Sequence, residues 1–209
     1  MLQDEKVIKL AKKYIKKKPI PSSLEKQFKL NDMENLLEEV YKRTAQLIKE
    51  NRNVNKEKMN HFKQILPSIA FYEVLLKKEK SKTKAIEIYE KWCFIKIEKM
   101  SKMIQNVLKI PGLYRNIPRV MKILINKVFG NLAGFDYIER NQKDGFAVDM
   151  IVCPYVETCK KYKCPELAYI FCKSDDICYS NMHPKLVWGR TKTLARGGNC
   201  CDFKLWIKK

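Results

Sequence analysis

The sequence lacks any uninterrupted apolar run of 18 residues, whereas a membrane-spanning helix needs about 20 such residues. Its first segment, MLQDEKVIKLAKKYIKKK, carries charges every few residues and has no apolar stretch like that of a secretory signal. We therefore expect a soluble, cytoplasmic protein without a membrane partner. That compartment is reducing, so the eight cysteines are expected to be thiols or ligands rather than disulfides.

Arginine is scarce in this strongly basic chain. The net charge is +20, and only seven of the 43 basic residues are arginines. Lysines are interleaved with glutamates, as in LLKKEKSKTK, and no helix-turn-helix, zinc-finger or RNP-type motif occurs. Because arginine rather than lysine makes bidentate contacts with bases and phosphates, this pattern favours a solvated lysine-rich surface and argues against a nucleic-acid partner. The sequence does not indicate an oligomeric state.

Residues 1 to 130 have the apolar periodicity of helices. The expected helix boundaries are stops at Pro19 and Pro21, a cap at Asn31 and Asp32, a break at Pro67, a start after Ser81 and an end at Pro111. A last helix is expected from about Pro118 to Phe129. His61 and Cys93 fall where core or face residues belong, so nothing in this half indicates catalysis.

The pattern changes after Gly130. GFDYIERNQKDGFAVDMIVC predicts a hairpin that turns near Asp144, and PYVETCKKYKCPELAYIFCKSDD predicts helix with a break near Pro165. KLVWGRTKTLA and CCDFKLWI flank RGGN and predict a second hairpin. We therefore expect an α+β fold in which a helical region, 1–130, packs with a cysteine-rich region, 131–209. The second region would hold an antiparallel sheet built from two hairpins around a helical insert, and the two regions would form one compact unit.

Seven of the eight cysteines lie between Cys153 and Cys201. Five residues lie between Cys153 and Cys159, four between Cys159 and Cys164, and seven between Cys164 and Cys172. Structural zinc sites usually pair ligands two to four positions apart. We therefore expect no cofactor and mostly small buried thiols, with a metal site left open by the spacing.

The stretch VCPYVETCKKYKCPELAYIFCKSDD, followed by RTKTLARGGNCCDFKLW, resembles the L-2-amino-thiazoline-4-carboxylic acid hydrolase family. Members share a Cys-Pro-Tyr, a Phe-Cys followed by Asp, and a glycine-containing turn that leads to Cys-Asp-Phe. LPSIAFYEVLLKK resembles the N-terminal helical region of the family. The shared motif positions are Cys153, Cys172, Asp175, Arg190, Thr193, Gly198, Cys201, Asp202 and Phe203. The departures from the pattern are Cys159, Cys164, Cys178 and the doublet Cys200–Cys201.

The resemblance implies a small-molecule substrate, a cyclic isothiourea with a carboxylate, whose ring opens by hydrolysis toward a carbamoyl-cysteine. The guanidinium of Arg190 would bind the carboxylate. One of Asp175 and Asp202 would bind the amidinium, and the other would be the general base. On a covalent path Cys172 would be the nucleophile, and His183 would protonate the leaving atom.

The resemblance also implies a role in substrate binding for Thr193 and Gly198. Backbone amides of the 196–199 turn would hold charge that develops on the substrate. Cys153 and Cys201 are motif cysteines without an assigned step.

Structural roles compete with these catalytic ones. Cys172 ends the apolar run LAYIFC and fits a buried, inert thiol. Asp175 can simply end a helix, and His183 can be an exposed loop residue without a function. Arg190 and Asp202, on paired strands, can form a cross-strand ion pair.

Strand alternation gives further expectations. It places Trp188, Arg190 and Lys192 on one face, with Thr191 and Thr193 on the other. On the neighbouring strand it places Cys201 and Phe203 opposite Asp202, which predicts a core position for Cys201.

Two classes of function follow. The first is a hydrolase of C–N bonds in a small cyclic amidine. The second is a non-catalytic ligand-binding or sensor domain, in which the cysteine cluster holds a metal, a tetrapyrrole or a redox signal.

Overall fold

The structure is a computed structural model that describes residues 2–16 and 30–208. The chain divides into two compact units, Met1–Cys93 and Phe94–Lys209. The boundary expected at residue 130 falls inside the second unit, because Leu108 and Tyr114 belong to the same core cluster as residues of the sheet.

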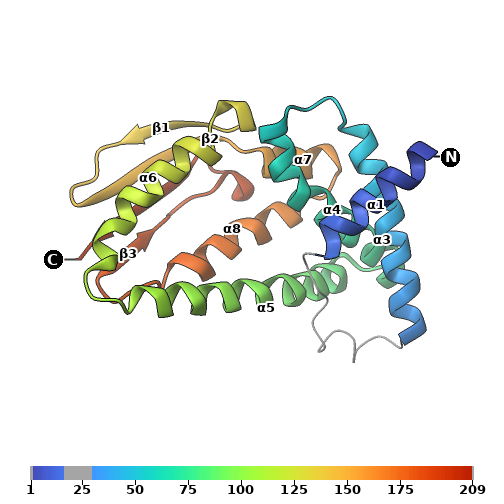
Figure 1. Cartoon of the computed structure of the whole chain (residues 1–209), viewed down its shortest axis with the longest axis horizontal. Coiled ribbons are helices and arrows are strands. Elements are labelled where there is room, and N and C mark those ends of the chain that lie inside the picture. Colours follow the sequence, from blue (N-terminus) through green and yellow to red (C-terminus); the bar gives the residue numbers. More distant parts are fainter. Residues whose placement is uncertain (1, 17–29, 209) are drawn as a thin grey trace. The chain divides into compact units, whose positions relative to one another are not determined.

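Helices form the first unit. They are α1 (Leu2–Lys16), α3 (Leu30–Glu50), α4 (Lys56–Glu79) and the beginning of α5 (Lys82–Leu108), as Figure 1 shows. The helical periodicity and the start after Ser81 are confirmed, and α3 begins one residue before the expected cap. Pro19 and Pro21 lie outside the described residues. Leu36, Val40 and Leu47 of α3 are buried, as their helical spacing predicts.

The helix break predicted at Pro67 is wrong, because α4 runs without interruption through this proline. A proline inside a helix costs about 3 kcal/mol, since it removes one hydrogen bond and crowds the preceding turn. Ile65, Leu66 and Ile69 around it are fully buried, and burying each such side chain contributes about 1.5–3 kcal/mol. Continuous burial on both sides of Pro67 therefore outweighs the lost bond.

The second unit is α+β, as predicted. After the rest of α5 its elements are η1 (Leu113–Asn116), α6 (Ile117–Val128), η2 (Asn131–Ala133), β1 (Asp136–Arg140), β2 (Gly145–Val152), α7 (Pro154–Lys161), α8 (Pro165–Tyr179), β3 (Leu186–Gly189), η3 (Leu194–Arg196) and β4 (Cys201–Ile207). The strands form an antiparallel sheet in the order β1-β2-β4-β3. The first hairpin, the helix break before Pro165 and the pairing of β3 with β4 agree with the sequence.

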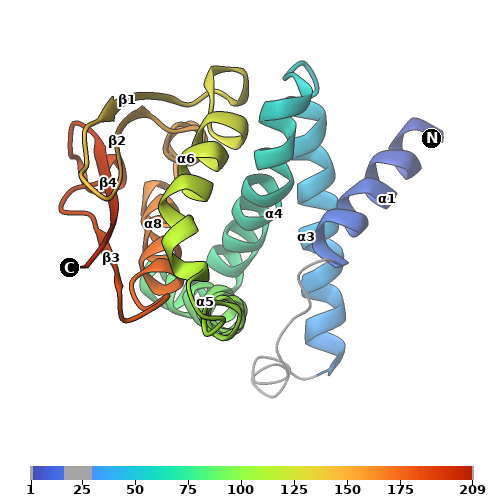
Figure 2. The ribbon, with the colours of Figure 1, turned by 60° about the vertical axis from the view of Figure 1, so that its left-hand side comes forward.

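Helices α6 and α8 both lie on one side of this sheet (Figure 2). The core of the unit is on that side, where Phe146, Val148 and Met150 of β2 are buried together with Cys201 and Leu205 of β4. The predicted core position of Cys201 is thus confirmed. Side chains from β3 and β4 that face the helices can meet α8 here, and this layer holds the candidate site.

The second hairpin differs from its prediction in one respect. β3 ends at Gly189, and residues 190–200 form a long connection that contains η3. The Asp202 carboxylate accepts hydrogen bonds from the backbone N–H groups of Thr191 and Lys192 at 2.9 and 2.8 Å. A side chain that binds backbone amides in this way competes with a strand ladder, so the expected alternation does not continue from Trp188 to Thr193.

Candidate functional site

One face of α8 supplies the acidic part of the site. Cys172, Asp175, Asp176 and Tyr179 are spaced at i, i+3, i+4 and i+7, which puts them on the same side of a helix. All four interact with Trp188, Arg190 or Cys201, so α8 presents this face toward β3 and β4.

Arg190 joins the end of β3 to α8. Its side chain is 3% exposed, and its Nη2 donates to Asp176 Oδ2 and to the Cys172 carbonyl, both at 2.6 Å. Nη1 reaches Asp175 Oδ2 at 3.5 Å. Burial alone would lower the pKa of the guanidinium, but the two carboxylates more than offset that effect and raise it.

The cross-strand pair of Arg190 with Asp202 is therefore wrong as a structural alternative. Arg190 points to the helix side of the sheet, and Asp202 binds Thr191 and Lys192 instead. The same contacts occupy the guanidinium that was expected to bind a substrate carboxylate, so this geometry does not favour that role.

Asp175 and Asp176 are neighbours with different environments. Asp176 is held by two donors, because Trp188 Nε1 binds its second oxygen at 3.0 Å. Among the described residues Asp175 has Arg190 as its hydrogen-bonding partner, at the longer distance of 3.5 Å. Most of the hydrogen-bonding capacity of the Asp175 carboxylate is thus available to a ligand or water.

The Asp175 carboxyl titrates in the neutral range. Desolvation by the surrounding protein raises its pKa to about 7, Asp176 adds to the rise, and Arg190 offsets part of it. Yet 43% of the side chain is exposed. A raised pKa and an exposed surface occur together when a carboxyl group is surrounded by protein atoms on most sides but still touches water. Asp175 therefore has the access and the pKa of a general acid or base.

Two tyrosines lie in the electrostatic range of Asp175. Burial, followed by the charge of Asp175, raises the pKa of both Tyr155 and Tyr179. Tyr155 packs edge-on against Phe171 with ring centroids 4.9 Å apart, and Tyr179 packs on Trp188 at 5.0 Å. Both phenols are thus neutral at physiological pH and can donate hydrogen bonds.

Three cysteines also lie within the electrostatic range of Asp175. Cys172 of α8 and Cys201 of β4 are hydrogen-bonded to each other, which raises the pKa of Cys172 and lowers that of Cys201. The Leu194 amide also donates to Cys201 Sγ at 3.2 Å. Cys153 lies at the N-terminus of α7, and burial raises its pKa to about 12, although the backbone N–H groups of Val156 and Tyr155 act in the opposite direction.

The other predicted site residues lie elsewhere. His183 precedes β3 whereas Arg190 follows it, and four strand residues alone span about 13 Å. The imidazole stacks on Tyr114 with ring centroids 4.4 Å apart, and its Nδ1 accepts the Lys185 amide at 3.1 Å. The structure thus gives His183 a place in a turn, apart from the acidic face of α8.

Thr193 and Gly198 belong to the connection between β3 and β4, and Asp202 of β4 binds that connection. Burial would raise the pKa of Asp202, but hydrogen bonds from Thr191 and Lys192 lower it overall. The Thr193 hydroxyl accepts the Arg196 amide at 3.2 Å and so caps η3. A Cβ at Gly198 would lie 2.9 Å from the Thr193 carbonyl oxygen, so this position needs glycine for close packing.

The expected charge-binding turn at 196–199 is not supported. The amides of Arg196, Gly197 and Gly198 all donate to carbonyls of Thr193 or Leu194 within the turn. These N–H groups are therefore already occupied, and the turn is a structural element.

The sequence-based predictions missed Asp176 as the partner of Arg190 and Trp188 as the second donor to Asp176. A signal for Asp176 exists in the sequence: it stands four residues after Cys172 on the same helical face. No sequence signal placed Tyr155 and Tyr179 near Asp175, because their positions depend on how α7 and α8 pack.

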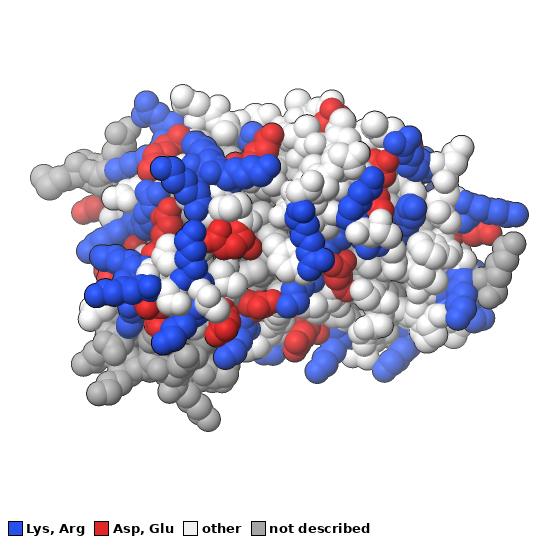
Figure 3. All heavy atoms as spheres, turned by 180° about the vertical axis from the view of Figure 1, so that it is seen from behind, with Lys and Arg blue, Asp and Glu red and all other residues white. Residues whose placement is uncertain are grey.

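No three His, Cys, Asp or Glu side chains converge to hold a metal ion in the part of the chain that the structure describes. The cysteines are all free thiols. No helix at residues 2–16 or 30–208 is both long and apolar enough to cross a membrane. On the face shown in Figure 3, lysines and arginines are dispersed with acidic groups among them, which agrees with the predicted solvated surface.

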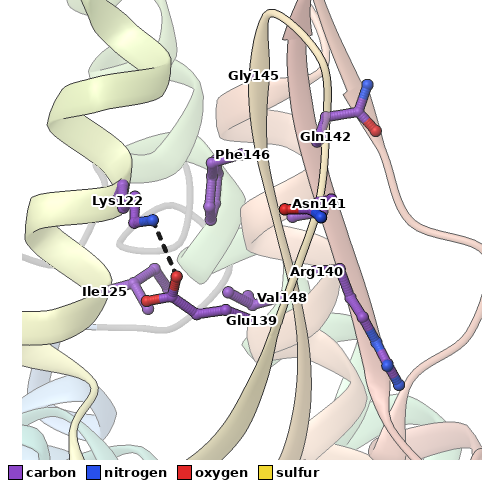
Figure 4. Close-up of a pocket in the computed structure, with 10 residues that line it drawn as sticks. Lys122, Ile125, Glu139, Arg140, Asn141, Gln142, Gly145, Phe146 and Val148 are labelled. Carbon is purple, nitrogen blue, oxygen red and sulfur yellow. Dashed lines mark ion pairs between the residues drawn. The ribbon is translucent and has the colours of Figure 1, made fainter.

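A polar pocket between α6 and the β1–β2 hairpin does not involve these residues. Lys122 and Glu139 form a 2.9 Å ion pair across it (Figure 4). Its wall also includes Phe146 and backbone near Gly145. Because none of the residues predicted for catalysis lines it, this pocket is distinct from the candidate site.

Comparison with known proteins gives one family. The model of the L-2-amino-thiazoline-4-carboxylic acid hydrolase family matches residues 58–205, more than two thirds of the chain. No curated protein matches the chain significantly, and neither does any solved structure.

Proposed function

The chain belongs to the L-2-amino-thiazoline-4-carboxylic acid hydrolase family, and on this premise we propose that it hydrolyses a C–N bond of a small cyclic amidine at Asp175. One observation supports the proposal above others. Asp175 is an accessible carboxyl with unused hydrogen-bonding capacity and a pKa raised to about 7. A general base works best when its pKa lies near the working pH.

In the proposed reaction, water adds to the amidine carbon of an aminothiazoline carboxylate. The ionised Asp175 takes a proton from the water as the new C–O bond forms. The C–N bond of the ring then breaks, and the protonated Asp175 returns the proton to the leaving nitrogen. The product is an S-carbamoyl-cysteine, and the step consumes one water and needs no other reactant.

Arg190 and Asp176 act as positioning residues in this proposal. Arg190 keeps part of the Asp175 population ionised, because its charge opposes the rise in the pKa of that carboxyl. Asp176 fixes Arg190 through the 2.6 Å bond. The neutral phenol of Tyr179 can donate a hydrogen bond to the substrate.

Direct attack by water is preferred to a covalent path through Cys172. That thiol is 8% exposed, and its hydrogen bond to Cys201, followed by burial, raises its pKa. A thiol is a far weaker nucleophile than a thiolate. Asp202 is assigned a structural role, because its oxygens bind Thr191 and Lys192.

The test is turnover of 2-aminothiazoline-4-carboxylate by the purified full-length protein, followed by chromatography of the carbamoyl-cysteine product. Asp175→Asn should lower kcat about 10²–10⁴-fold, the usual contribution of a general base. Asp144→Asn is the matched control: it removes the same charge at a turn with φ of 55°, a conformation that asparagine tolerates. Turnover retained by Asp175→Asn would refute the role of Asp175, and no turnover by wild type would refute the substrate.

A non-catalytic sensor domain is the second candidate. The observation that favours it is the hydrogen-bonded pair of Cys172 and Cys201, which does not take part in the hydrolysis proposed above.

A further inference from the structure

The polar pocket between α6 and the β1–β2 hairpin holds two opposite charges that the proposed hydrolysis does not use. Lys122 comes from α6 and Glu139 from β1, and their side chains meet across the pocket at 2.9 Å (Figure 4). They are 58% and 48% exposed, so small solutes can reach both charges. An ion pair this exposed contributes little to folding, and its members can therefore separate to bind a ligand.

The other polar side chains of the pocket differ in how far they are occupied. Arg140 is paired with Asp149 at 2.8 Å. The Gln142 side chain donates to the Lys143 carbonyl at 3.3 Å. Asn141 is exposed on the hairpin side of the pocket, and its side chain has no hydrogen-bonding partner in the described part of the chain. An amide both donates and accepts, so this side chain can bind either charge of a ligand.

An apolar floor lies beside these polar groups. Ile125 of α6 and Phe146 and Val148 of β2 line the pocket and belong to the buried core. Figure 4 shows the Phe146 ring between the helix and the hairpin. The pocket has a volume of about 180 Å³, which is about six times the volume of one water molecule in the liquid. Because covalently bonded atoms pack more closely than separate waters, the space suits a compound the size of a small amino acid.

We propose that this pocket binds a small apolar α-amino acid as its zwitterion. The ammonium of Lys122 binds the carboxylate of the ligand, and the carboxylate of Glu139 binds its ammonium, so that the four charges alternate in sign. The Asn141 amide adds a hydrogen bond at the edge of the pocket. The side chain of the ligand covers the apolar floor at Phe146. L-Valine meets these demands of charge and size.

The ion pair itself favours a ligand with both charges. A carboxylate without an ammonium would take Lys122 from Glu139 and leave Glu139 without its counter-ion. An amine without a carboxylate would do the same to Lys122. A zwitterion gives each side chain a new partner of opposite charge, so neither loses its pairing. This binding is independent of the hydrolysis assigned to Asp175, because Asp175 does not line the pocket.

The experiment titrates the full-length protein with L-valine by isothermal titration calorimetry. We expect a Kd of about 1 mM, since so small a ligand makes few contacts. Isovalerate, which lacks the ammonium, and isobutylamine, which lacks the carboxylate, should each bind at least about tenfold more weakly. Glycine keeps both charges but lacks the apolar side chain, and it should also bind more weakly than L-valine.

Substitutions at the two charged residues test where the ligand binds. Lys122→Met and Glu139→Gln should each weaken the binding of L-valine at least about tenfold, because each removes one charge-assisted bond. Lys77→Met is the matched control: it removes an exposed ion pair of similar length, 3.1 Å to Glu39, that does not line the pocket. It should leave the Kd unchanged. In NMR spectra of the wild type, L-valine should shift the amide signals of residues 139–148 and of α6.

The proposal is overturned if L-valine at about 20 mM does not bind, or if isovalerate or isobutylamine binds as tightly as L-valine. It is also overturned if Lys122→Met or Glu139→Gln retains the affinity of the wild type, or if the shifted amides lie outside α6 and the hairpin. Circular dichroism establishes that each variant is folded. Because none of these readouts depends on turnover, they are decided even if the protein does not hydrolyse an aminothiazoline.

Discussion

Arg190 donates a 2.6 Å hydrogen bond to Asp176 and is itself only 3% exposed. A guanidinium this deeply buried needs a partner, since an unpaired charge in such a position is strongly destabilising. The pair therefore fixes the position of β3 against α8, and with it the separation between the Asp175 carboxyl and the sheet.

Asp176→Asn should destabilise the protein. It removes a charge-assisted bond to Arg190, although Asp175 and the Cys172 carbonyl remain as partners. Because Asp176 is 45% exposed, we expect a loss of about 1–3 kcal/mol in the free energy of unfolding, measured by urea denaturation. Glu39→Gln is the control, because its ion pair with Lys77 is exposed on both sides and should contribute less than about 1 kcal/mol. Equal losses in both variants would contradict a structural role for Asp176.

Asp175→Asn should change how stability depends on pH. The folded-state pKa of Asp175 is about 7, above the value of 3.8 expected when it is unfolded. Its favourable contribution is therefore complete below pH 3.8 and is lost as the pH rises through about 7. The neutral variant should gain stability over wild type across this window, as measured by urea unfolding at pH 5, 6, 7 and 8. A difference that stays constant across these pH values would argue against the raised pKa of Asp175.

Asp202→Asn should show the opposite dependence. Hydrogen bonds from Thr191 and Lys192 lower the pKa of Asp202 in the folded state, so its contribution is present above the unfolded value of 3.8 and is lost as the pH falls through the folded value. At pH 7 the variant should lose about 1–3 kcal/mol, since one acceptor becomes a donor facing backbone N–H groups. The difference from wild type should shrink on acidification, and a difference that grows instead would contradict this assignment.

His183→Asn should retain turnover, if the protein hydrolyses the aminothiazoline. The asparagine oxygen can replace Nδ1 as the acceptor for the Lys185 amide, and the imidazole lies beyond β3 from Arg190. We expect kcat to change by less than about tenfold, whereas removal of a general acid costs about 10²–10⁴. A larger loss in folded protein would restore the role as proton donor that was expected for His183.

Much of the fold follows from local patterns. Apolar residues at helical spacing located α3, α5 and α6, and two strand patterns joined by a turn near Asp144 located the β1–β2 hairpin. Such patterns are local because a helix or hairpin buries one of its own faces wherever it packs. Pro67 is the exception, since only the burial of its neighbours explains why α4 continues through it.

The site was predictable in its members but not in its pairings. The motif drew attention to Cys172, Asp175, Arg190 and Cys201, which the structure does bring together. The strand pattern offered a pair of Arg190 with Asp202 as the structural alternative to a substrate contact, because both residues were expected in paired strands. The residues at 190–200 have no periodicity that predicts where β3 ends. β3 ends at Gly189 because Asp202 binds the next backbone amides, those of Thr191 and Lys192.

The sequence by itself determined the class of fold, the order of its elements, the family motif and the surplus of lysine. Only the tertiary structure decided which carboxylate is held by two donors and which is left for water, and which cysteine keeps its proton. The physical reason is that ionisation depends on desolvation and on charges within a few ångströms. In this protein those neighbours come from α7, α8, β3 and β4, which are separated along the chain and meet only when it folds.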